Sequence, residues 1–140
     1  MKPKSILFVC KYNRFRSRIA EAYFNKINKN KNYKAESAGV IEGFMPLDKN
    51  QVRIAKEFGL SISGKPRAMS MDLLKRQNMI IVVANDVPKS LFSYKWYKNK
   101  VIKWGVRDVK EGADTKGART STKKIIKKVN SLVKQLEKKK

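Results

Sequence analysis

The feature that most constrains the fold is a buried strand that runs directly into a basic loop and then into a helix. Residues 5–9, with the sequence Ser-Ile-Leu-Phe-Val, form a mostly apolar run that is typical of a parallel strand covered on both faces. A polar segment follows, and from about Arg16 an apolar stripe predicts a helix, formed by Ile19, Ala20, Tyr23 and Ile27. Because this order is the first half of a strand-helix-strand unit, the sequence predicts an α/β fold.

The rest of the chain continues to alternate between strands and helices. Strands are predicted at residues 33–37, 79–84 and 100–104, and helices at 48–58, 70–76, 88–94 and 125–136. Asp48 and Ser70 are the expected helix caps, and Gly59 is a natural helix stop. We therefore expect a three-layer sandwich with a central four-stranded parallel sheet and helices on both faces, its binding site lying at the carboxyl ends of the strands. With neither a repeat nor a linker, residues 1–140 are expected to form a single domain.

Composition excludes several classes of function. The chain contains no histidine, so no histidine base, triad or metal ligand is possible. Its longest apolar runs are too short to span a bilayer, and one cysteine cannot form an internal disulfide, so a cytoplasmic protein without membrane contact is expected. The formal charge of +23 predicts attraction to polyanions, but without zinc-ligand spacing or an RNA-binding signature we expect nucleic-acid binding to be at most non-specific.

The loop between the first strand and the first helix carries the candidate chemistry. Backbone N–H groups at a helix start can face an anion, and phosphate is the expected guest. These donors and Arg16 favour the thiolate form of Cys10, a nucleophile, while Arg16 can bind two phosphoryl oxygens and Ser17 can donate to the sulfur. The expected phosphate-binding residues are Lys11, Tyr12, Asn13, Arg14, Phe15, Arg16 and Ser17. On spacing alone Cys10 would read as a small buried side chain; its position between strand and helix favours the catalytic interpretation.

With these residues in this order, the sequence resembles the low-molecular-weight protein tyrosine phosphatases and the related thioredoxin-coupled arsenate reductases, which share one fold. The similarity covers nearly the whole chain and includes residues 36–40, 46–63, 79–84 and 102–108. The resemblance implies that Cys10 forms a phosphocysteine, that Arg16 binds phosphate, and that Asn13 braces the loop. It also implies that Asp108 is the general acid and base, and that neither a metal ion nor an organic cofactor is needed.

The loop differs from the family pattern at several positions. Tyr12 stands where the family usually has glycine, Phe15 replaces a second cysteine, and Arg18 replaces proline. Val109 follows the predicted acid where proline is expected. Asp114 is an alternative acid, although an aspartate in such a loop is more often a solvated turn residue.

Two other functions remain open. An arsenate reductase would use the same loop but would need an external thiol, because this chain has one cysteine. A catalytically weak protein could instead bind a phosphorylated partner or polyanion for regulation. For the phosphatase, a phosphorylated protein or a small phosphoester is expected, with phosphotyrosine and phosphoarginine both possible, and Tyr97 or Trp104 could form a stacking wall.

Overall fold

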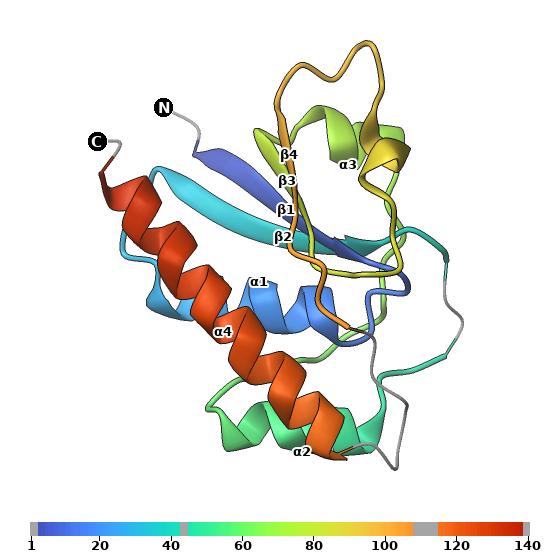
Figure 1. The fold of residues 1–140 in the computed structure, drawn as a ribbon, viewed down its shortest axis with the longest axis vertical. Helices are drawn as coiled ribbons and strands as arrows, with labels where there is room; N and C mark the ends of the chain where they lie inside the picture. The colour runs from blue at the N-terminus through green and yellow to red at the C-terminus, as the bar shows by residue number, and fades with distance from the viewer. Residues whose placement is uncertain (1–2, 43–44, 108–114, 139–140) are drawn as a thin grey trace.

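A four-stranded parallel sheet forms the centre of the computed structural model, which describes residues 3–42, 45–107 and 115–138 (Figure 1). The strand order is β2-β1-β3-β4. The strands are β1 (Lys4–Cys10), β2 (Tyr33–Gly39), β3 (Met79–Val82) and β4 (Lys100–Lys103). In this register Cys10 lies opposite Gly39, and Val9 lies opposite Val82. The last residues of β1 are therefore placed in the middle of the sheet, at the edge where parallel strands place their binding sites.

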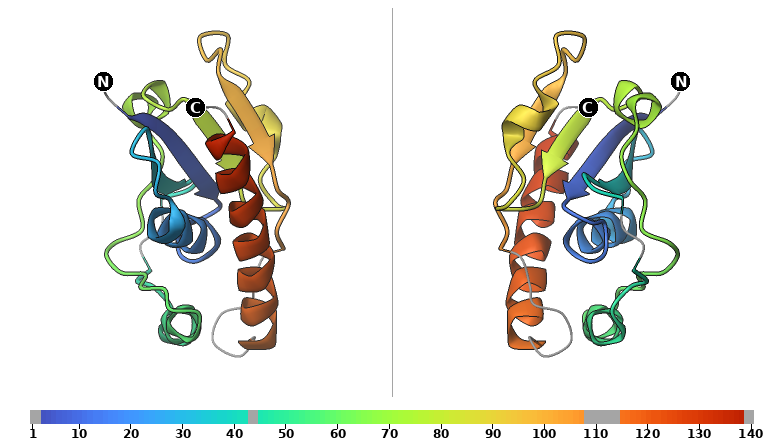
Figure 2. Two further views of the ribbon diagram at one scale, coloured as in Figure 1. Left: turned by 90° about the vertical axis from the view of Figure 1, so that its left-hand side faces the viewer. Right: turned by 90° about the vertical axis from the view of Figure 1, so that its right-hand side faces the viewer.

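Helices cover both faces of the sheet, as the sequence predicted (Figures 1 and 2). One face carries α1 (Arg16–Ile27), α2 (Lys49–Glu57) and α4 (Thr115–Glu137), and the other carries α3 (Met71–Lys75) and the 3-10 helix η1 (Lys89–Phe92). Alternate side chains of β1 supply the two cores, because successive residues of a strand point to opposite faces. Phe8 packs with the first group of helices, and Leu7 packs with the second. Because helices cover both faces of β1, residues 6–9 are all apolar and do not alternate with polar residues.

The expected helix ends are confirmed by their local geometry. Asp48 accepts hydrogen bonds from the backbone N–H groups of Asn50 at 2.9 Å and Gln51 at 3.0 Å. Ser70 accepts one from Leu73 N at 3.1 Å, so it caps α3. Gly59 has a φ of 74°, the left-handed conformation that ends a helix at low cost in glycine.

The last helix is longer than the sequence predicted. Its apolar stripe is evident only from Ile125, but α4 extends back to Thr115, the first described residue after position 107. Ala118, Ser121 and Thr122 are buried in this first part, where small and hydroxyl side chains fit against the neighbouring elements without forming a recognisable apolar stripe. The β2 strand is also longer, reaching Gly39. No helix in the described ranges is long and apolar enough to cross a bilayer.

Candidate functional site

The loop from Cys10 to Ser17 lies where β1 ends and α1 begins. Its backbone is held against the end of β2, since Val40 N donates to Cys10 O at 3.0 Å and Ile41 N donates to Lys11 O at 2.9 Å. Gly39 permits this close approach. A Cβ atom at Gly39 would lie 2.7 Å from the carbonyl carbon of Tyr12, which is closer than real Cβ contacts. The glycine is therefore required by the loop that it supports.

The Cys10 sulfur is buried and hydrogen-bonded to Ser17. The distance between Cys10 Sγ and Ser17 Oγ is 3.0 Å, and only 2% of Cys10 is exposed. Asn13 Nδ2 donates to the same Ser17 oxygen at 2.8 Å, which leaves the hydroxyl hydrogen of Ser17 to be donated to the sulfur. The loop thus provides a hydroxyl donor directly at the thiol.

Asn13 organises the centre of the loop. Its φ is 58°, a left-handed conformation that asparagine tolerates better than most residues. Besides Ser17, its Nδ2 donates to Ser37 Oγ at 3.0 Å, and its Oδ1 accepts from Arg67 N at 2.8 Å. Ser37 Oγ in turn donates to Glu21 Oε1 at 2.5 Å. One side chain therefore ties the loop to β2, to α1 and to the segment that precedes α3.

Arg16 is held by groups that follow β3 and β4. Its Nη1 donates to Val106 O at 3.0 Å and lies 3.1 Å from Asp86 Oδ1, while only 4% of the side chain is exposed. Asn85 Oδ1 is at 3.5 Å from the same nitrogen. The sequence pattern around Arg16 did not predict these partners. A signal was present, because Asn85 and Asp86 directly follow the predicted strand at 79–84 and so had to lie at the carboxyl edge of the sheet.

Arg18, which stands at the family's usual proline position, connects the loop to a distant segment. Its guanidinium donates to Asn13 O at 2.9 Å and also to the carbonyl oxygens of Ser63 and Lys65. Burial lowers the pKa of Arg18, and the nearby Glu21 carboxylate opposes that change. The arginine therefore replaces the rigidity of a proline ring with three hydrogen bonds to backbone carbonyl groups.

The four other side chains of the loop differ in their surroundings. Tyr12 is 40% exposed, and the Lys11 ammonium lies 5.3 Å from the centre of its ring. Arg14 Nε donates to Pro46 O at 3.0 Å. Phe15 is buried in the core beside α1, so the position that carries a second cysteine in the family pattern is a packing position here.

The two aromatic residues that could have formed a stacking wall lie elsewhere. The Tyr97 hydroxyl donates to Gln77 O at 3.1 Å, near the amino end of β3 and therefore opposite to the loop. Trp104 follows β4 and packs on Phe8, with their ring centres 5.7 Å apart. The predicted acid Asp108, its neighbour Val109 and the alternative acid Asp114 lie outside the described residues. Within the described ranges, no group of three or more Cys, Asp or Glu side chains is placed to hold a metal ion.

Comparisons with known proteins point to one family. Residues 5–140 match the model of the low molecular weight phosphotyrosine protein phosphatase family. An arsenate reductase from Archaeoglobus fulgidus is 30% identical, with a TM-score of 0.74 over 91% of this chain and 98% of that chain. A low molecular weight protein tyrosine phosphatase from T. tengcongensis is 25% identical, with a TM-score of 0.81 over 94% and 99%.

A more distant match shows the same fold. The YwlE arginine phosphatase from Geobacillus stearothermophilus is 17% identical, with a TM-score of 0.83 over 98% of this chain and 95% of that chain. No curated protein matches the sequence at a significant level.

Proposed function

Since the chain belongs to the low molecular weight phosphotyrosine protein phosphatase family, we propose that it hydrolyses phosphomonoesters through a phosphocysteine intermediate on Cys10. The observation that carries this proposal is the position of the Cys10 sulfur, 3.0 Å from the Ser17 hydroxyl at the junction of β1 and α1. A helix amino terminus and the loop amides favour an anion at this junction. The substrate is a phosphorylated protein or a small phosphoester, and no organic cofactor or metal ion takes part.

In the first step, the Cys10 thiolate attacks phosphorus. A sulfur–phosphorus bond forms while the bond between phosphorus and the leaving oxygen breaks. Asp108 donates a proton to that oxygen, so that the alcohol leaves uncharged. Arg16 donates hydrogen bonds to two non-bridging oxygens, and the backbone amides of residues 11–17 bind the phosphoryl group with it. The role of Asp108 rests on the family resemblance.

In the second step, water attacks the phosphocysteine. The Asp108 carboxylate accepts a proton from the water, the sulfur–phosphorus bond breaks, and inorganic phosphate is released. The sulfur of Cys10 leaves as a thiolate, which the Ser17 hydroxyl stabilises by donating a hydrogen bond. Asp86 and Val106 act as positioning groups in both steps, because their contacts with Nη1 hold the Arg16 guanidinium in one orientation.

Hydrolysis of para-nitrophenyl phosphate across a range of pH tests the mechanism. Cys10→Ser is expected to abolish turnover, because the serine hydroxyl is a far weaker nucleophile than the thiolate. Asp108→Asn is expected to lower kcat by about 10²–10⁴-fold and to remove the corresponding limb of the pH profile. Asp114→Asn is the matched control, which removes the same charge from the same segment and leaves kcat close to that of the wild type.

Two outcomes would overturn this assignment. A wild type that is folded and binds vanadate, but neither hydrolyses para-nitrophenyl phosphate nor reduces arsenate, would identify a phosphate-binding regulatory protein. A loss of activity in Asp114→Asn with an active Asp108→Asn would transfer the acid role to Asp114.

A second candidate function is favoured by the 30% identity to an arsenate reductase. Cys10 would attack arsenate and displace water, and an external thiol would then attack the Cys10 sulfur, so that arsenic leaves as arsenite. A second external thiol would release Cys10, and two thiols would be oxidised to one disulfide as arsenic(V) is reduced to arsenic(III). Thiol-dependent release of arsenite without hydrolysis of para-nitrophenyl phosphate would replace the phosphatase proposal with this reaction.

A further inference from the structure

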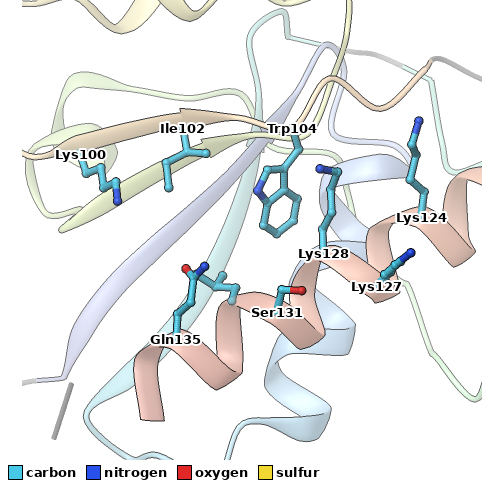
Figure 3. A pocket seen from close by; sticks show the side chains of 9 residues that line it. Lys100, Ile102, Trp104, Lys124, Lys127, Lys128, Ser131 and Gln135 are labelled. Carbon is cyan, nitrogen blue, oxygen red and sulfur yellow. The ribbon is translucent and has the colours of Figure 1, made fainter. Parts of the chain in front are cut away.

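A groove of about 670 Å³ lies between the edge strand β4 and the last helix α4 (Figure 3). On the strand side it is lined by Lys100, Ile102 and Trp104. On the helix side it is lined by lysines and polar residues, among them Lys124, Lys127 and Lys128. We call this feature the β4–α4 groove. In the proposed mechanism it has no role, because none of its lining residues belongs to the loop from Cys10 to Ser17.

The β4–α4 groove carries a positive charge that its own lining residues do not neutralise. Four of its nine lining residues are lysines, and none is acidic. In the described part of the chain, none of these lysines forms a salt bridge or a hydrogen bond with a protein group. Lys124 and Lys128 are four residues apart on α4, which places them about 6 Å apart along the helix. The repulsion among these charges would be relieved by a ligand with several separate negative charges.

The floor of the groove offers an aromatic surface between these charges. Trp104, the residue after β4, projects toward α4 in Figure 3, and Ile102 lies two residues before it, within the strand. The Phe8 ring packs against the Trp104 ring, and the Lys128 ammonium lies 6.0 Å from the centre of the Trp104 ring. Lys124 and Lys127 lie at one end of the groove and Lys100 at the other (Figure 3). A ligand that fits this pattern carries a flat apolar group between anionic groups.

We infer that the β4–α4 groove binds single-stranded nucleic acid without sequence preference. A base would pack on Trp104 and Ile102, while the phosphates on either side would be contacted by Lys124, Lys127 and Lys100. This combination of a cationic groove with an aromatic platform is how proteins bind single strands non-specifically. An acidic peptide fits less well, since its carboxylates would use the lysines and leave the aromatic floor without a partner.

Fluorescence anisotropy of a labelled 15-residue oligouridylate, titrated with the full chain at several salt concentrations, tests this inference. Lys124→Gln/Lys127→Gln is expected to weaken binding by about tenfold at low salt and to make the slope of log K against log salt shallower by about 1.4, since each lost phosphate contact is worth about 0.7. Trp104→Leu is expected to weaken binding by about fivefold or more and to leave the salt slope unchanged, because it removes stacking and not charge.

The matched control is Lys123→Gln/Lys134→Gln, which removes the same charge from two exposed lysines of the same helix that do not line the groove. It is expected to change the affinity less than twofold. Equal weakening by the control and the groove variant would show that net charge alone attracts the strand, and this would overturn the site. Stronger competition by polyglutamate than by unlabelled oligouridylate would assign the groove to an acidic peptide. Inorganic polyphosphate is expected to bind both the wild type and Trp104→Leu equally, because it has no base.

Discussion

At the residue scale, Asn13 is the side chain on which the geometry of the loop most depends. It is 1% exposed, its amide group makes hydrogen bonds to Ser17, Ser37 and Arg67, and its backbone is left-handed. Two separate properties are therefore combined in one residue. The hydrogen bonds satisfy buried groups from three segments, and the asparagine lowers the cost of the positive φ.

Replacement of Asn13 separates these two properties. Asn13→Ala leaves buried partners unsatisfied and also forces alanine into the left-handed region, so we expect it to lower the free energy of unfolding by about 2–4 kcal/mol. Asn13→Gly is the matched variant, because glycine accepts the positive φ but makes none of the bonds. It should be about 1 kcal/mol less destabilising than the alanine variant. Urea denaturation gives both values, and equal destabilisation would show that backbone strain is not important here.

At the element scale, Glu36 connects β2 to the end of α3. Its carboxylate accepts from Arg76 Nη2 at 2.8 Å and from Gln77 Nε2 at 2.7 Å. Gln77 is buried and also accepts from Ser5 Oγ at 2.8 Å, so the contact extends to β1. The carboxylate thus fixes the covering helix on one face of the sheet.

These contacts make the contribution of Glu36 to the free energy of unfolding dependent on pH. Burial raises the pKa of Glu36, but hydrogen bonds from Arg76 and Gln77 and the charges of Arg76 and Arg67 outweigh it and lower the pKa to about 2, from 4.5. Because the folded-state pKa is depressed, the contribution of Glu36 is fully present above about pH 4.5 and is lost as the pH falls toward 2.

Glu36→Gln tests this dependence. The free energy of unfolding should be lower than that of the wild type at pH 6, and the difference should shrink between pH 4.5 and 3, because the wild-type carboxyl becomes protonated there in the unfolded state. Urea denaturation at several pH values measures the difference. Glu42→Gln serves as the control, since it makes the same change of charge at an exposed position outside these contacts. A difference for Glu36→Gln that is constant with pH would contradict the coupling.

At the scale of the whole molecule, the dominant feature is charge. The chain carries 34 lysines and arginines against 11 acidic residues, and a net charge of +23 favours expanded states through self-repulsion. Added salt screens this repulsion, since the Debye length falls from about 10 Å at 0.1 M to about 3 Å at 1 M.

The melting temperature should therefore rise as sodium chloride is increased from 20 mM to 500 mM, measured by circular dichroism. Glycine betaine at equal osmolality is the control, because it is uncharged overall and does not screen. Phosphate at the same ionic strength should stabilise the protein further through binding at the loop, and Arg16→Ala should remove that additional increment. A melting temperature that is independent of salt would show that the positive charges are too widely separated to destabilise the fold.

Much of the fold and the core of the candidate site could be predicted from the sequence, because they depend on residues close together in the chain. The loop lies directly between the strand at 5–9 and the helix that begins at Arg16. This order brings Cys10, Asn13 and Ser17 together where the strand ends and the helix begins. The helix caps at Asp48 and Ser70 were predicted for the same reason, since a capping side chain bonds to groups two or three residues away.

Only the tertiary structure decided what surrounds that loop. Arg67, Asp86 and Val106 reach it from 54 to 90 residues away, and the β4–α4 groove joins Trp104 to lysines on a different element. The local pattern places Asp86 at the carboxyl edge of the sheet, but which residues make contact there depends on the strand order and on how each helix packs on the sheet. A sequence determines where strands and helices begin and end through short-range hydrogen bonds and hydrophobic periodicity, whereas the partners of a buried charge or an edge strand follow from the packing of the whole chain.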